Sequence, residues 1–230
     1  KNVFIENGKD KTGNIFNVPN FEYCCNKYKN SFDIITGDGG FDFSNDFNGQ
    51  ERTSGRLILT QVLYTIMMQK FNGCCVIKLF DVFSQLTIDI IYLLSSLYNF
   101  IYIIKPNTSR YANSERYVVC KSFKLYDSTR YYSTFLDILK NFSKKEDTHY
   151  LSGLLKLPLN YCILNKIEDS NAIIGQQQLE NLNLTVNLIN NKSGEKIETM
   201  KKNNIQKCIN WCIKHKLPYH KSISNINSFI

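Results

Sequence analysis

The chain has 230 residues, 43% of them hydrophobic, so it is long enough to bury the core of one domain with an extension. Its 28 basic and 20 acidic residues give a formal net charge of +8, which favours an anionic partner without identifying one. The longest apolar stretch, residues 88–104, is too short and too often interrupted by polar side chains to span a bilayer, so we expect no membrane partner.

The hydrophobic pattern of the first half alternates between strands and helices. Strands are predicted at residues 32–36, 74–79, 100–104 and 117–120. Amphipathic helices are predicted at 51–70 and 85–98, with Gly73 ending the first of them and Pro106 ending the third strand. This alternation is typical of an α/β fold with a parallel, Rossmann-like sheet and right-handed crossovers.

The second half has a helical pattern. Residues 1–126 are predicted to form the α/β domain, and residues 127–230 a helical extension packed on it. Helices are expected at 130–142, 170–191 and 205–215, whereas 151–164 is either a short helix or irregular because Pro158 interrupts it.

The cysteines indicate the cellular environment more than a site. Cys208, Cys212 and His215 share one face of the last predicted helix, and such a face can hold a metal. No fourth ligand is evident and cysteine is a common core residue, so we predict no metal site. We expect the eight cysteines to be reduced thiols in an intracellular protein of the nucleus or the cytoplasm.

Three ionisable residues, Asp38, Lys78 and Glu115, lie where a predicted strand meets a loop. Lys78 interrupts an apolar run that otherwise indicates a buried strand, and a buried charge is costly unless it is paired or used. At the carboxyl edge of an α/β sheet, two carboxylates and a lysine would form a proton-handling site. Each residue alone also has an ordinary explanation, because a lysine that ends a strand usually reaches solvent and Asp-Gly-Gly is usually a turn.

Five segments together resemble the FtsJ/RrmJ-like ribose 2′-O-methyltransferases, and within them the messenger-RNA cap-1 enzymes of eukaryotes and large viruses. The segments are residues 38–41, 50–51, 78–81, 105–110 and 113–121, and residues 108–121 are the most specific part. The resemblance covers residues 1–126 and is fainter beyond them. It implies a mostly parallel methyltransferase sheet with an antiparallel last strand, S-adenosylmethionine as cofactor and capped RNA as substrate, with other capping or transcription factors as partners.

The family works with a Lys-Asp-Lys-Glu tetrad, and Asp38, Lys78 and Glu115 match its last three members. The resemblance implies that Lys78 is the general base and that the two carboxylates orient it. The first lysine and the Gly-rich methionine-binding loop have no counterpart here. We therefore expect the N-terminal part of the fold to be missing from this chain. We also expect the segment alone to bind the cofactor weakly or not at all and to transfer no methyl group.

The resemblance also implies the contacts of cofactor and RNA. On the RNA side, arginine suits phosphate through its forked donors, although Arg110 and its neighbours could equally form an ordinary polar turn. Two alternatives stay open: a catalytically inactive RNA-binding or scaffolding subunit with the same fold, and a 2′-O-methyltransferase of ribosomal or transfer RNA. The expected cofactor contacts are Asn14, Ile15, Asp38 and Gly39, and the expected RNA contacts are Asn48, Arg110, Asn113 and Ser114.

Overall fold

The computed structural model describes residues 2–42, 46, 48–144, 151–156, 158–191 and 194–219. The chain divides into two compact units, Lys1–Gln178 and Leu179–Ile230. The first unit holds the sheet and the helices packed on it, and the candidate site lies entirely within it. The division after residue 126 that the sequence suggests stays a prediction.

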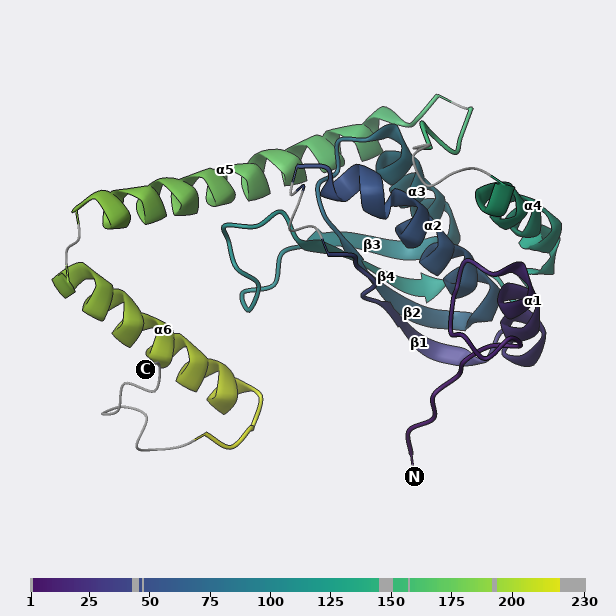
Figure 1. The fold of residues 1–230 in the computed structure, drawn as a ribbon, viewed down its shortest axis with the longest axis horizontal. Helices are drawn as coiled ribbons and strands as arrows, with labels where there is room; N and C mark the ends of the chain where they lie inside the picture. The colour runs from purple at the N-terminus through teal and green to yellow at the C-terminus, as the bar shows by residue number, and fades with distance from the viewer. Residues whose placement is uncertain are drawn as a thin grey trace. The chain divides into compact units, whose positions relative to one another are not determined.

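The described residues of the first unit form a four-stranded sheet in the order β1-β2-β4-β3 (Figure 1). The strands are β1 (Phe32–Gly37), β2 (Gln69–Leu79), β3 (Tyr98–Ile104) and β4 (Arg116–Phe123). β1 pairs with β2 in parallel, whereas β4 runs antiparallel to both β2 and β3. Three strands therefore share one direction and the last strand opposes them, which confirms the predicted sheet.

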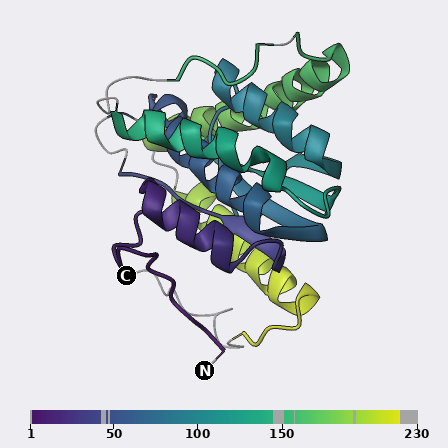
Figure 2. The same ribbon diagram turned by 90° about the vertical axis from the view of Figure 1, so that its right-hand side faces the viewer.

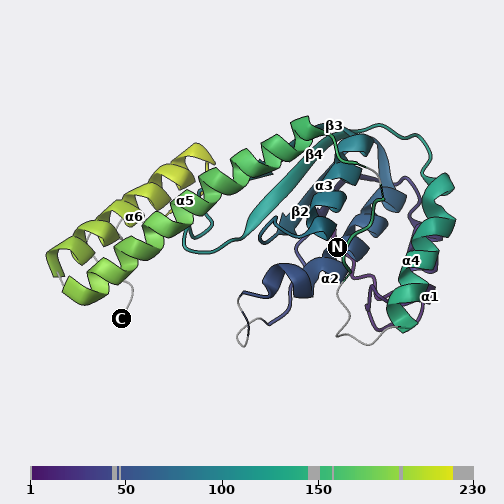
Figure 3. The same cartoon turned by 90° about the horizontal axis from the view of Figure 1, so that it is seen from above.

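Helices cover one face of this sheet. α2 (Gln50–Met68) and α3 (Gln85–Leu97) lie along the sheet (Figures 1 and 3), and α1 (Val18–Lys27) and α4 (Tyr132–Lys144) pack on α2 and on each other (Figure 2). Side chains alternate along a strand, so β2 and β4 each give one row to this core. The buried row contains Cys75, Ile77, Leu79, Val118 and Cys120.

The sequence misplaced the junction between α2 and β2. The helix ends at Met68 and the strand starts at Gln69 without a loop, so Gly73 lies within the strand instead of ending the helix. The buried Gln69 side chain explains the change, since it donates hydrogen bonds to the carbonyl oxygens of Phe32 at 2.7 Å and Asp33 at 3.2 Å. These bonds attach the chain to β1 at the point where the helical pattern would continue.

The second half also differs from its predicted elements. A short 3₁₀ turn, Thr129–Tyr131, precedes α4, and in the first half α1 was not predicted. One long helix, α5 (Tyr161–Asn191), begins nine residues before the predicted helix at 170–191 and includes the end of the segment 151–164. Residues 151–156 and 158–160 are irregular, which is one of the two alternatives for that segment, and the buried Asp89 carboxylate accepts hydrogen bonds there from the backbone N–H groups of Leu154 and Leu155, at 2.7 and 2.8 Å. α6 (Gly194–Lys214) contains most of the predicted last helix and begins earlier.

No helix in the described part of the chain combines the length and the apolar character needed to cross a bilayer.

All eight cysteines are free. Within the described ranges, no group of three or more His, Cys, Asp or Glu side chains is arranged to hold a metal ion.

Candidate active site

Lys78 and Asp38 form the centre of the candidate site. Lys78 is the penultimate residue of β2, and Asp38 follows β1 directly, so the parallel pairing of the two strands brings them together. Lys78 Nζ lies 2.9 Å from Asp38 Oδ1 and donates a hydrogen bond to the Asp38 carbonyl oxygen at 3.1 Å. The lysine side chain is 16% exposed and that of Asp38 is 71% exposed. The charge of Lys78 is therefore paired, while the carboxylate stays open to solvent.

The loop that carries Asp38 is held from the helix side of the sheet. The Gly39 N–H donates a hydrogen bond to Gln61 Oε1, on α2, at 3.0 Å. A Cβ at Gly39 would lie 2.9 Å from Gln61 Nε2, and one at Gly37 would lie 2.9 Å from Ile77 Cδ1. A side chain at either position would displace the end of the Gln61 or Ile77 side chain, so the two glycines allow the loop to lie close to α2 and β2. Gly39, predicted as a cofactor contact, also fixes this loop.

Glu115 lies immediately before β4 and is held by hydroxyl groups. Its Oε1 accepts hydrogen bonds from Tyr117 at 2.9 Å and from Ser109 at 3.4 Å. Tyr117 pairs with Lys78 in the register of β2 and β4, and residues directly opposite each other in a sheet point to the same face. Glu115 thus contacts the neighbour of Lys78, and its direct approach to the lysine stays a prediction.

Tyr117 was missed as a functional residue in the sequence analysis. Burial, with the hydrogen bond to Glu115 as the next cause, raises the pKa of Tyr117 to about 12. The hydroxyl therefore stays protonated near neutral pH and continues to donate to the carboxylate. The residue was visible in the sequence as part of the resembling segment, but only the strand register places it beside Lys78.

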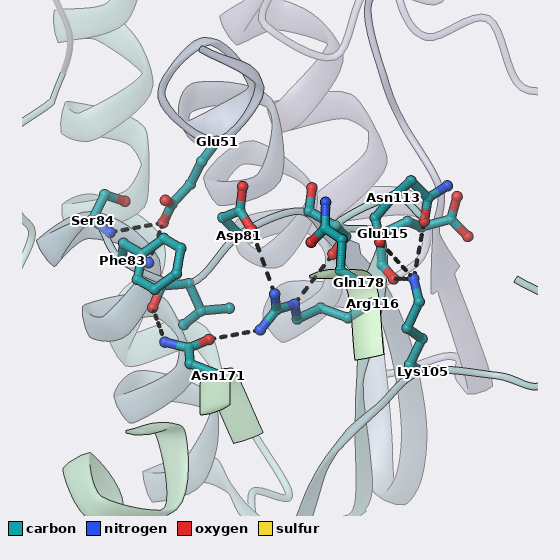
Figure 4. A network of polar contacts seen from close by, with 12 residues as sticks. Glu51, Asp81, Phe83, Ser84, Lys105, Asn113, Glu115, Arg116, Asn171 and Gln178 are labelled. Atoms are coloured by element: carbon teal, nitrogen blue, oxygen red, sulfur yellow. Dashed lines mark hydrogen bonds and ion pairs between the residues drawn. The ribbon is translucent and has the colours of Figure 1, made fainter. Parts of the chain in front are cut away.

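Lys105, which follows β3, closes the loop that ends at Glu115. Its Nζ donates hydrogen bonds to the carbonyl oxygen and Oδ1 of Asn113, each at 2.9 Å, and to the Glu115 carbonyl oxygen at 2.8 Å (Figure 4). Burial lowers the pKa of Lys105, and the nearby Glu115 partly offsets that effect. The ammonium group therefore organises this loop from inside.

The four predicted RNA contacts fall into two kinds. Arg110 and Asn48 are exposed, in the loop after β3 and in the turn before α2 respectively. Asn113 accepts from Lys105 as described, and Ser114 is buried, with its carbonyl oxygen accepting a hydrogen bond from Arg116 Nε at 3.2 Å. Arg110 and Asn48 thus present side chains to an incoming ligand, while the other two also build the loop.

Arg116, the first residue of β4, is 1% exposed and lies at the centre of a polar network. Its NH2 group is 3.5 Å from Asp81 Oδ1, and its NH1 group donates to Asn171 Oδ1 on α5 at 2.6 Å (Figure 4). Burial raises the pKa of Asp81 while Arg116 opposes that shift, and burial lowers the pKa of Arg116. Both ions therefore bear a desolvation cost to hold this arrangement.

The loop that contains Asn14 and Ile15, two of the expected cofactor contacts, is organised around Asp10. The Asp10 carboxylate accepts hydrogen bonds from the Thr12 N–H at 2.9 Å, Asn17 Nδ2 at 2.6 Å and Asn20 Nδ2 at 2.8 Å, and these bonds lower its pKa. In the same loop Asn14 is exposed, and Ile15 is partly buried against the core. Asn14 offers polar groups and Ile15 an apolar surface, which is the mixture that a nucleoside requires.

Replacing Gly8 in this loop by alanine is expected to destabilise the protein by about 1–3 kcal/mol, because Gly8 has a φ of +74° and a Cβ would collide with Asn20 Oδ1. Denaturant unfolding measures the effect. The matched control is Gly175→Ala in α5, where nothing lies within 4 Å of an added Cβ, and it should stabilise the protein by about 0.5–1 kcal/mol. Equal stability of Gly8→Ala and the wild type would contradict this account of the loop.

Comparison with known proteins gives the family. Residues 2–123 match the model of the FtsJ-like methyltransferases. The chain belongs to this family. As the resemblance implied, the matched part contains β1 to β4 and with them Asp38, Lys78 and Glu115.

Three proteins that are similar in sequence or structure illustrate how the relatives of this chain are named. It is 34% identical over 188 residues to a cap-specific mRNA (nucleoside-2′-O-)-methyltransferase 1 of Leishmania braziliensis, covering 78% of this chain and 46% of that protein. It is 32% identical over 152 residues to an inactive cap-specific mRNA (nucleoside-2′-O-)-methyltransferase 1B of Caenorhabditis briggsae, covering 63% and 18%. A solved ribosomal RNA methyltransferase of Plasmodium falciparum is 24% identical, with a TM-score of 0.38, over 53% of this chain and 62% of that one.

This FtsJ-like chain spans less than half the length of the Leishmania braziliensis relative and of the Caenorhabditis briggsae relative.

Proposed function

We propose that the intact protein methylates a ribose 2′-hydroxyl of RNA, at the first transcribed nucleotide of a capped messenger RNA. The observation that carries the proposal is the Lys78–Asp38 pair, a largely buried ammonium group 2.9 Å from an exposed carboxylate. It lies opposite Tyr117, which holds Glu115. The choice of a capped substrate is supported by the cap-specific relatives.

S-adenosylmethionine, when bound, supplies an electrophilic methyl group. The residues that would hold its adenosine side are Asn14, Ile15 and the loop of Asp38 and Gly39. A ribose hydroxyl is a poor nucleophile, so the protein must align it and accept its proton. Lys78 is the residue that accepts that proton, on Nζ.

The two carboxylates have different tasks in this proposal. Asp38 orients Lys78 Nζ through the contact at 2.9 Å and stabilises the ammonium group that forms. Glu115, fixed by the hydroxyl groups of Tyr117 and Ser109, adds negative charge on the side of β4. Both groups therefore favour the protonated product over the reactant state.

The exposed residues of the two loops would bind RNA. Arg110 offers a forked guanidinium group to a phosphate, and Asn48 offers an amide to the cap base. Asn113 and Ser114 shape the loop from which Arg110 projects, and contact the RNA with the groups that remain open. The excess of 28 basic over 20 acidic residues favours association with this polyanion.

The direct test is methyl transfer by the intact protein to short capped RNA, uncapped RNA, and ribosomal and transfer RNA, with S-adenosylmethionine labelled in its methyl group. We expect label on the 2′-oxygen of the first transcribed nucleotide of capped RNA, located by nuclease digestion and mass spectrometry. Label confined to ribosomal or transfer RNA would reject the cap assignment and retain the reaction.

An inactive RNA-binding subunit is the second candidate, and the inactive relative of Caenorhabditis briggsae is the observation that favours it. Measuring the binding of capped RNA beside the same transfer assay separates the two, because this candidate binds capped RNA without transferring the label. Tight binding with no transfer to any RNA would reject the proposed enzyme.

A further inference from the structure

Helix α5 contributes a side chain that contacts the chain shortly after each of two candidate catalytic residues, Lys78 and Glu115. Asn171 Oδ1 accepts a hydrogen bond from Arg116 NH1 at 2.6 Å, and Asn171 Nδ2 donates one to the Val82 carbonyl oxygen at 2.7 Å (Figure 4). Arg116 is the residue after Glu115, and Val82 lies in the connection from β2 to α3, four residues after Lys78. The oxygen and the nitrogen of the Asn171 side-chain amide therefore each have a hydrogen-bond partner.

The connection that contains Val82 is also held from the other side. Glu51, on α2, accepts hydrogen bonds from the backbone N–H groups of Phe83 at 3.0 Å and Ser84 at 2.8 Å (Figure 4). Ser84 in turn caps α3, because its hydroxyl accepts from the Thr87 N–H at 3.3 Å. The segment after β2 is thus fixed between α2 and Asn171.

A second residue of α5 contacts the loop that carries Arg110. Gln178 Nε2 donates a hydrogen bond to the Ala112 carbonyl oxygen at 3.4 Å. Asn171 and Gln178 are two turns apart on one helix, so they lie on the same side of it. Asn171 and Gln178 of α5 therefore contact the chain on the two sides of Glu115, at Arg116 and at Ala112.

We propose that Asn171 is a positioning residue for the methyl-transfer reaction: it ties the connection after Lys78 to the residue after Glu115 and so fixes the two relative to each other. The inference rests on the proposed function, which it deepens. Asn171 acts through Arg116 and Val82.

The expected effect follows from what each partner loses. Without the amide, NH1 of the buried Arg116 and the Val82 carbonyl oxygen both lack a protein partner, and unpaired buried groups drive local rearrangement. A displacement of about 1 Å in a catalytic group can cost about 100-fold in rate. We expect Asn171→Ala to lower kcat by about tenfold, with the KM for capped RNA changed less than about twofold.

Two further variants separate positioning from general stability. Asn171→Asp keeps the acceptor for Arg116 and removes the donor to Val82, so it should recover part of the lost kcat. The control is Asn165→Ala, an exposed asparagine of the same helix, which makes the same change in helix propensity. It should leave kcat, KM and the melting temperature unchanged.

The experiment compares these variants of the intact protein in kcat, KM, melting temperature and amide hydrogen exchange of residues 105–116. Exchange should rise in Asn171→Ala and stay unchanged in Asn165→Ala. Wild-type kcat in Asn171→Ala overturns the proposal, as does a loss of kcat that Asn171→Asp does not partly reverse. Should Asn171→Ala not fold, Asn171→Asp decides: a wild-type kcat overturns the proposal, and a lowered kcat at an unchanged melting temperature supports it.

Failure of the proposed function has a different outcome. In that case the wild-type intact protein transfers no methyl group to any RNA, whatever the variants do. Hydrogen exchange then still tests the positioning role, and unchanged exchange of residues 105–116 in Asn171→Ala overturns it.

Discussion

Replacing Lys78 by alanine in the intact protein is expected to lower kcat for methyl transfer by about 10³-fold or more, while the binding of RNA and cofactor changes little. The reason is that Lys78 Nζ is the group placed to accept the proton, and alanine leaves the exposed Asp38 carboxylate without its partner. Lys78→Arg should fail as well, because arginine does not release its proton. Single-turnover methyl transfer with labelled cofactor measures the effect.

A second lysine of β2 provides the control. Lys70 Nζ lies 2.9 Å from Asp33 Oδ1, so this pair joins the same two strands at the same distance as Lys78 and Asp38. Its side chains are 55% and 75% exposed, and exposed pairs contribute only about 0–1 kcal/mol to stability. Lys70→Ala should therefore keep wild-type turnover. Near wild-type turnover in Lys78→Ala would refute the proton-accepting role.

Replacing Arg116 by methionine is expected to destabilise the protein by about 2–4 kcal/mol. Removing one ion of a buried pair costs about 3–5 kcal/mol because the other ion is left unpaired. The Asp81 side chain is 32% exposed and water can partly replace its partner, which places the expected value toward the lower end. Denaturant unfolding with an unchanged m-value measures this loss.

The control for Arg116 is Arg130, an exposed arginine that contacts the Tyr131 hydroxyl at 2.8 Å. Arg130→Met should change stability by less than about 0.5 kcal/mol. Combining Arg116→Met with Asp81→Leu should recover part of the loss, since an apolar pair bears no desolvation cost. If Arg116→Met alone is as stable as the wild type, the network does not hold the start of β4.

The candidate catalytic residues could be predicted in part from the sequence. Lys78 breaks an apolar strand pattern, and the placement of Asp38 at the end of the preceding strand follows from the alternation of strands and helices. In a parallel pair, consecutive strand ends lie at one edge, so their meeting required no knowledge of side-chain conformation. The local sequence pattern and the strand topology both place Lys78 beside Asp38, and their side chains lie 2.9 Å apart.

Other residues of the site could not be predicted, because their roles depend on contacts between distant segments. Lys105 contacts a loop that folds back on it, and Tyr117 acquires its neighbour Lys78 from a register that no local pattern specifies. Asn171 lies 55 positions from Arg116 in a helix whose start the sequence misplaced.

The antiparallel pairing of β4 with β2 limits how the length of this region can vary. Val118 and Cys120 are 0% exposed toward the helices, whereas Tyr117 lies on the opposite face beside Lys78. Deleting one residue between Glu115 and Val118 would exchange the two faces of the strand, bury the tyrosine hydroxyl and turn core side chains to solvent. A change of length within β4 would therefore keep the core row and the site row on their own faces only if it added or removed an even number of residues.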